Sequence, residues 1–157
     1  MTRKTIFLTL ALLAAVSCQK QQYVIYDNPY VYVYYSNDSS LSETSSVLSM
    51  SNNLQRTYNV CLSSRRRDTP LTVSYEIVVG DGLTEGVDFE MVTEGSSVTF
   101  EPDTYVQPIT IKYLRRKVDK TQDNTITIRL TGADSEMQLG IPGAVPKNVT
   151  HTIKKTN

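Results

Sequence analysis

The sequence predicts an all-β protein, specifically an antiparallel β-sandwich of about seven to eight strands. From residue 23 onward, short segments rich in β-branched residues alternate between apolar and polar side chains. Turn residues separate these segments at intervals of about 8–12 residues, which is typical of sandwiches. Beyond the N-terminal leader, no segment repeats its apolar residues with the 3.6-residue period of a helix.

The first strand is expected over residues 23–35, with Pro29 marking a break or an edge position. Beyond Pro29, the side chains of Tyr30, Tyr32 and Tyr34 fall on one face, and the intervening residues fall on the other. The Ser- and Asn-rich residues 36–53 are expected to form a long loop, which has room for a short strand at 47–50.

Segment 71–79 has the clearest alternation, with apolar residues at odd positions and mostly polar residues between them, as in a half-buried antiparallel strand. All seven glycines lie between Gly80 and Gly143, where they are expected at turns. The remaining strands are expected at residues 57–63, 89–92, 97–100, 109–114, 125–130 and 149–153.

The N-terminus predicts export. A basic start at Arg3 and Lys4 precedes an eleven-residue apolar run and small residues, as in a secretory signal, and this run is too short to span a membrane. The expected organisation is a signal peptide at 1–17, a lipidated cysteine with its tether at 18–28, and one domain at 29–157. Removing the signal leaves 140 residues with fourteen basic and sixteen acidic side chains, a net charge of −2.

Cys18 is the candidate lipid anchor. The segment from Ala14 to Cys18 resembles the bacterial lipobox, with Ala15 where leucine is usual. With this leader the chain resembles small Bacteroidota lipoproteins, which implies attachment to the outer membrane. An acidic run after the cysteine would favour surface display, and none follows Cys18, so a periplasmic-facing and a cell-surface position both stay open.

The composition excludes several functions. The balanced charge does not fit a nucleic-acid binder. The chain contains one histidine, two cysteines and no tryptophan, which leaves little material for a zinc site or a nucleophile–base pair. Cys61 and His151 both fall in strand-like segments and are expected to serve packing. We therefore predict no enzymatic activity and no cofactor.

Residues 71–153 contain a series of short segments, namely 73–75 (Val-Ser-Tyr), 85–89 (Glu-Gly-Val-Asp-Phe), 98–100 (Val-Thr-Phe), 109–111 (Ile-Thr-Ile) and 126–130 (Ile-Thr-Ile-Arg-Leu), with Pro102 between the third and fourth. In their order and spacing these segments resemble the Calx-beta domain, a calcium-binding β-sandwich, and the resemblance implies a Calx-beta- or immunoglobulin-like fold. The family would imply calcium bound by paired acids before residue 126. At the matching positions this chain has Arg116 and Lys117, and only Asp123 remains as an acid, so we expect no metal.

The candidate binding surface combines tyrosines with two basic segments. Six of the ten tyrosines lie between Tyr23 and Tyr35, and they suit either packing or the recognition of sugar rings or a partner strand. The two basic segments are most simply interpreted as solvated turns. If they lie close together in the fold, they could instead bind an acidic glycan, a lipid head group or a protein. The candidate residues are Tyr30, Tyr32, Tyr34, Arg65, Arg66, Arg67, Arg115, Arg116 and Lys117.

Two functions fit these features. The first is a non-catalytic accessory lipoprotein that binds a glycan or a protein partner. The second is a structural, adhesin-like or pilus-associated subunit that acts by strand pairing. A tyrosine-rich first strand that is fully paired within its sheet would disfavour strand donation.

Overall fold

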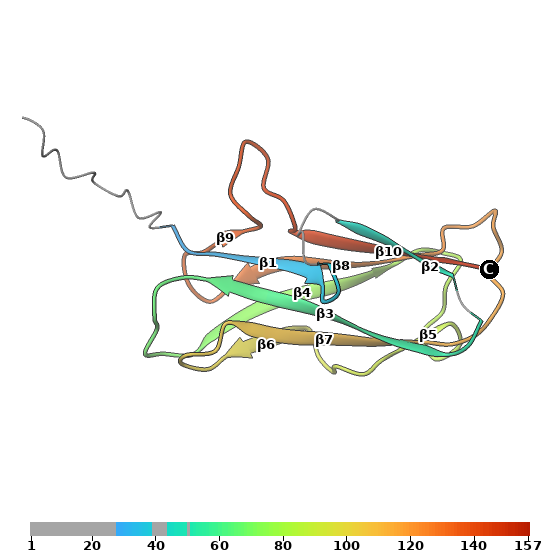
Figure 1. The fold of residues 1–157 in the computed structure, drawn as a ribbon, viewed down its shortest axis with the longest axis horizontal. Helices are drawn as coiled ribbons and strands as arrows, with labels where there is room; N and C mark the ends of the chain where they lie inside the picture. The colour runs from blue at the N-terminus through green and yellow to red at the C-terminus, as the bar shows by residue number, and fades with distance from the viewer. Residues whose placement is uncertain (1–27, 39–43, 50) are drawn as a thin grey trace, which may run out of the picture.

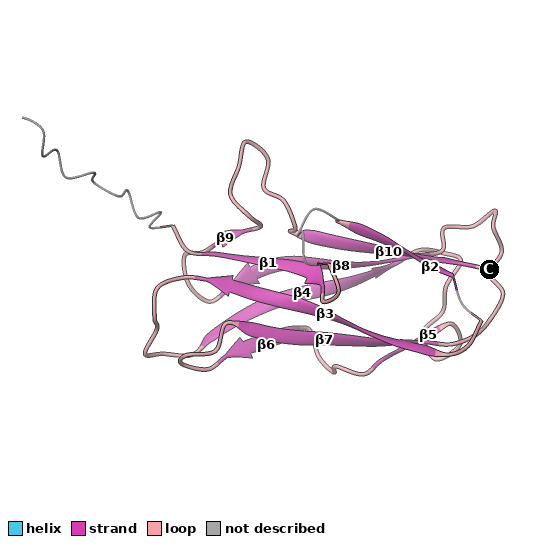
Figure 2. Cartoon of the chain, viewed as in Figure 1, coloured by secondary structure: helices cyan, strands magenta, loops and turns pink. Residues whose placement is uncertain are grey.

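The computed structural model describes residues 28–38, 44–49 and 51–157, and within them every regular element is a strand (Figure 2). The alternation of apolar and polar side chains along a strand determines which face of its sheet points into the core. In the strand at Leu71–Val79, Leu71, Val73 and Tyr75 are buried, whereas Ser74 and Glu76 between them are exposed. A strand of this pattern has only one face to cover, so it stacks on a second sheet.

The strands form two five-stranded sheets that enclose a shared core (Figure 1). The first sheet has the order β5 (Phe89–Met91), β7 (Val106–Tyr113), β3 (Leu54–Ser63), β1 (Tyr30–Tyr35) and β9 (Gln138–Leu139). The second has the order β2 (Ser45–Ser49), β10 (Thr150–Thr156), β8 (Thr125–Ala133), β4 (Leu71–Val79) and β6 (Ser97–Phe100). The all-β prediction is therefore confirmed, and the layered arrangement is consistent with a sandwich.

The sheets are mixed, which departs from the predicted antiparallel sandwich at two strand pairs, and they contain ten strands rather than seven to eight among the described residues. β9 runs parallel to β1, and β2 runs parallel to β10, while the other pairs are antiparallel. The first two strands belong to different sheets: β1 lies between β3 and β9 in one sheet, and β2 is an edge strand of the other. Alternation reports which face of a strand is buried but not which neighbour it pairs with, so these parallel contacts left no sequence signal.

Most predicted strands are present with small shifts at their ends. β2 begins two residues before the expected short strand, and β9, only two residues long, was missed. Gly132 lies within β8 rather than at a turn, opposite Ser74, beside the register shift between Ser74 and Tyr75. A glycine inside a strand commonly accompanies such a bulge. Residues 23–27 of the expected first strand, like the leader, lie outside the described residues.

A buried ion pair joins the two sheets. The Nζ of Lys155 on β10 donates to Oδ1 of Asp88, just before β5, over 3.3 Å, and to the Asp88 carbonyl over 3.2 Å. Both residues are buried, at 1% and 6% exposure. The backbone N–H of Thr84 donates to the other Asp88 oxygen over 3.0 Å. Asp88, part of the Calx-beta resemblance, therefore serves as a structural partner of Lys155.

Tyr58, Tyr113 and His151 also pack together in the core, where their polar atoms lie close to one another or to Ser46. The Tyr58 and Tyr113 hydroxyls lie 2.8 Å apart, and His151 is fully buried with its ring centroid 5.3 Å from that of Tyr58. The Nε2 atom of His151 lies 3.3 Å from the Ser46 hydroxyl. The packing role expected for His151 is consistent with these contacts.

Candidate binding surface

The tyrosine row, consisting of Tyr30, Tyr32 and Tyr34, lies on the outer face of β1. All three rings are half-buried, whereas Val31 and Val33 between them are fully buried in the core. Ring centroids of successive tyrosines lie 5.8 and 6.0 Å apart, with interplanar angles of 35° and 28°. The rings thus follow one another along the strand, tilted in the first pair and stacked in the second.

The neighbouring strand supports this row with short side chains. In the antiparallel register, Tyr30 lies opposite Ser63, Tyr32 opposite Cys61 and Tyr34 opposite Asn59. Asn59 Nδ2 donates to the Tyr34 hydroxyl over 3.3 Å. The burial expected for Cys61 is confirmed at 6% exposure.

Packing changes the ionisation of Tyr32 and of Cys61 opposite it. Burial, together with the neighbouring Cys61, raises the pKa of Tyr32 to about 12. Burial also raises the pKa of the Cys61 thiol, against the opposing effect of hydrogen bonds from Tyr32 and Tyr34. At neutral pH the Tyr32 hydroxyl is therefore protonated and can donate a hydrogen bond.

Both edges of β1 are hydrogen-bonded. Its six residues pair with β3 on one side. On the other side, the Pro29 and Val31 carbonyls accept from the N–H groups of Gln138 and Gly140 over 3.0 and 2.7 Å. Further along, Val33 N–H donates to the Asn148 carbonyl over 2.8 Å, and Asn148 Nδ2 donates back to the Val33 carbonyl over 3.2 Å.

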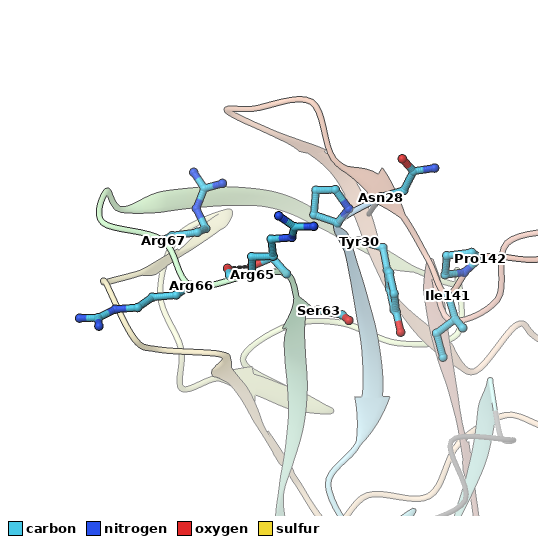
Figure 3. Close-up of a pocket in the computed structure, with 10 residues that line it drawn as sticks. Asn28, Tyr30, Ser63, Arg65, Arg66, Arg67, Ile141 and Pro142 are labelled. Carbon is cyan, nitrogen blue, oxygen red and sulfur yellow. Dashed lines mark hydrogen bonds between the residues drawn. The ribbon is translucent and has the colours of Figure 1, made fainter. Parts of the chain in front are cut away.

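Tyr30 also lines a pocket of about 690 Å³ at the end of the row (Figure 3). Three segments far apart in the chain meet there: the start of β1, the turn after β3 and the loop after β9. We call this the arginine pocket; its lining residues are Asn28, Pro29, Tyr30, Ser63, Ser64, Arg65, Arg66, Arg67, Ile141 and Pro142.

The three arginines of the pocket differ in their surroundings. Arg66 points away from it (Figure 3) and forms a two-point ion pair with Asp103, at 3.0 Å from Nε and 3.1 Å from Nη2. Arg65 is exposed and extends toward the β1 side of the pocket. Arg67 is half-buried, and its Nε atom is buried without a hydrogen-bond partner.

The second basic segment, with Arg115, Arg116 and Lys117, lies at the opposite end of the sandwich (Figure 1). It follows Tyr113, which pairs with Leu54 at the start of β3, whereas the first basic turn follows Ser63 at the end of β3. Nine residues of extended strand span about 30 Å. The structure therefore brings the tyrosine row to the first basic turn, and the two basic segments do not form one surface.

The pocket is suited to binding rather than to proton or metal chemistry. Its lining includes guanidinium groups, hydroxyls, an aromatic ring and apolar proline and isoleucine side chains, and contains no Asp, Glu, His or Cys. In the part of the chain that the structure describes, no three or more His, Cys, Asp or Glu side chains are grouped to hold a metal ion. In the loop between β7 and β8, Asp119 Oδ1 accepts hydrogen bonds from the N–H and the hydroxyl of Thr121, and the Asp123 N–H donates to Asp81 Oδ1 in the turn after β4.

Sequence reasoning missed the other walls of the pocket, namely Asn28, Pro29, Ile141 and Pro142. The segment from Gly140 to Gly143 indicates a loop, and Gly140 adopts a φ of +84° with no room for a Cβ, which would lie 2.5 Å from Val149. No pattern in the sequence of this loop indicates that it lies beside the turn after β3.

No family model matches the chain, and no curated protein matches it. Among the described residues there is no helix of the length and apolar character needed to cross a membrane. The candidate function therefore depends on the geometry of this surface.

Proposed function

We propose that this protein is a non-catalytic binding module that holds a glycan along the tyrosine row. One observation carries the proposal: the ring of Tyr30 belongs both to the row and to the wall of the arginine pocket. A continuous surface thus combines flat aromatic faces with a hollow that has polar groups at one end. Concave sites with apolar walls and a few polar groups are the usual form of ligand sites.

The chemistry of the row suits sugars. A tyrosine ring is a rigid apolar face that carries a hydroxyl, so it can contact the C–H face of a sugar and hydrogen-bond at its rim. Three such rings are already ordered by stacking and by β3, so little conformational entropy is lost on binding. The pocket lining contains no acid, histidine or cysteine that could act as a general base, which supports binding without catalysis.

The pairing of β1 favours this function over strand donation. A donated strand must leave its own sheet, and β1 is hydrogen-bonded to β3 on one edge and to β9 and Asn148 on the other. Val31 and Val33 are fully buried, so withdrawing the strand would also expose the core.

An immunoglobulin-like topology is our proposal for the finer fold. Taken in chain order, β1, β3, β4, β5, β7, β8 and β10 correspond to strands A to G of that fold. β1, β3, β7 and β5 are then neighbours as A, B, E and D, and β4, β8 and β10 as C, F and G. The order and spacing of the Calx-beta-like segments support the same class of sandwich.

Export and lipid anchoring at Cys18 are further proposals, supported by the leader sequence, which lies outside the described residues. Acyl chains on Cys18 would hold the binding domain at the outer membrane. Replacing it (Cys18→Ser) should move the protein from the membrane fraction to the soluble fraction; unchanged retention would refute the anchor.

The glycan proposal is tested by applying the full chain to a glycan array. We expect binding to at least one class of glycan that Tyr30→Ala or Tyr34→Ala weakens by tenfold or more. Val78→Ala is the control, because Val78 is exposed on β4 in the other sheet. Absence of binding to every glycan would overturn the proposal, and a protein captured through the same tyrosines would replace it.

A further inference from the structure

We infer that the loop after β9 inserts its tip into the surface of the lipid bilayer and so orients the domain on the membrane. We call residues 142–146 of this loop the apolar tip. The inference rests on the anchoring proposed at Cys18 and goes beyond glycan binding, because it assigns a second surface of the domain and its partner. The composition of the tip, its fixed base and its position beside the start of β1 each contribute to it.

The apolar tip has no polar or charged side chain. Its sequence is Pro-Gly-Ala-Val-Pro, and residues 143–146 are exposed. Val145, at 76% exposure, is the most exposed large hydrophobic residue in the part of the chain that the structure describes. Single exposed apolar residues are ordinary on protein surfaces, so the meaning of this one depends on how the tip is held and where it lies.

The base of the loop holds the tip in a fixed position. The Ile141 N–H donates to the Lys147 carbonyl over 2.7 Å, and the Lys147 N–H donates back to the Ile141 carbonyl over 3.1 Å. On either side of this pair, Gly140 donates to the Val31 carbonyl, and the Asn148 carbonyl accepts from β1. Both ends of the loop are therefore tied to β1, and burying the tip costs little conformational entropy.

The loop lies close to the point where the chain enters the described domain. Asn28, Ile141 and Pro142 line the same pocket, and the loop extends beyond the sheet edge formed by β9 (Figure 1). Cys18 precedes Asn28 by ten residues, and ten fully extended residues span at most about 35 Å. A lipid anchor at Cys18 would therefore keep this end of the sandwich, with the apolar tip, near the bilayer.

A bilayer suits the tip better than a sugar or a protein partner does. The tip offers a sugar no side-chain hydrogen bond, and five small residues are too few for a stable protein interface. Its two prolines have no N–H, which leaves fewer backbone donors to satisfy in lipid. Lys147 is exposed at the base, from where its long side chain can reach phosphate head groups. Anchoring makes insertion an intramolecular step, so a small apolar contact is enough.

The test uses an introduced tryptophan, because the chain contains none. The full chain carrying Val145→Trp is expressed with its leader, recovered from the membrane fraction and reconstituted into vesicles of phosphatidylethanolamine and phosphatidylglycerol. We expect the indole emission to shift to shorter wavelength and to fall about twofold or more with lipids brominated near the head group, since interfacial segments lie about 5–10 Å deep. Acrylamide in the water should quench it weakly.

Two further variants control for the probe and for the anchor. An indole itself favours the membrane interface, so Val92→Trp is the matched control: Val92 is 49% exposed and follows β5, at the opposite edge of the sheet from β9. Its emission should respond to acrylamide and not to brominated lipid. Adding Ala144→Asp to Val145→Trp places a charge on the tip and should return the indole to water while the chain stays in the membrane fraction. Thermal unfolding checks that each variant is folded.

The alternative results separate this inference from the proposals on which it rests. A chain that stays in the membrane fraction, but whose indole at the tip is not quenched by brominated lipid, would overturn the inference and leave the anchor standing. Equal quenching in Val145→Trp and Val92→Trp would overturn it as well, because the domain would have no preferred orientation. Recovery of the chain in the soluble fraction would overturn the anchor and the inference together, and the glycan array reports separately on glycan binding.

Discussion

Cys61 lies directly opposite Tyr32 in the antiparallel pair of β1 and β3, and only 6% of it is exposed. Burial raises the pKa of the thiol, so little thiolate is present at neutral pH. The tyrosine row thus covers the one thiol that would remain after lipidation of Cys18.

Removing the ring of Tyr32 should expose this thiol. In a chain carrying Cys18→Ser, we expect Tyr32→Ala to raise the rate of Cys61 modification by a thiol reagent at least tenfold. Tyr30→Ala is the matched control, because Tyr30 lies opposite Ser63. Equal rates in the two variants would mean that Tyr32 does not shield Cys61.

The ion pair between Lys155 and Asp88 should contribute strongly to the free energy of unfolding. Lys155→Met leaves a buried carboxylate without its cation and should cost about 3 kcal/mol, measured by urea denaturation. Adding Asp88→Asn should recover part of this loss. Arg129→Met, which breaks the half-exposed pair with Glu76, is the control and should cost less than about 1 kcal/mol. A similar small cost for Lys155→Met would contradict a structural role for the buried pair.

The protein should lose stability at alkaline pH. Burial raises the pKa of Tyr32 to about 12 and also raises those of Tyr58, Tyr75 and Tyr113. Folding therefore favours the protonated phenols, and their contribution is complete below pH 10, the ordinary value. As the pH rises from 10 toward 12, the unfolded chain ionises first and stability falls.

Phenolate absorbance measured against pH checks this expectation. The native protein should show a fraction of tyrosines that ionise late, and the same titration in urea should show all of them near the ordinary pKa. Coincident titration curves would contradict the burial of these hydroxyls.

The sequence predicted the faces of the strands better than their neighbours. Segments 71–79 and 97–100 match β4 and β6 in extent, because a strand with one buried face leaves a period of two in the sequence. The common face of the tyrosine row follows from the same rule. The parallel pairing of β2 with β10 depends on contacts between residues about a hundred positions apart, and no local pattern records it.

For the candidate site, too, the sequence indicated the residue types but not which segments lie side by side. Two basic segments of similar composition looked equivalent in the sequence, yet topology places the first beside Tyr30 and the second at the far end of the sandwich. The pocket itself requires the loop with Ile141 and Pro142 to fold against the start of β1. Hydrogen bonds from Gln138 in β9 and from Gly140 just after it hold this loop to β1, and the sequence did not predict β9.

A double-mutant cycle between Tyr30 and Arg65 tests the central claim most directly, namely that the tyrosine row and the arginine pocket form one site. Affinity is measured for the tightest-binding glycan of the array in the full chain, in Tyr30→Ala, in Arg65→Gln and in the double variant. If both residues contact one ligand, each single change weakens binding about tenfold, and the double variant departs from the sum by 0.5 kcal/mol or more, as is typical of coupled neighbours. Strictly additive losses, or an unchanged affinity in Tyr30→Ala, would contradict the account.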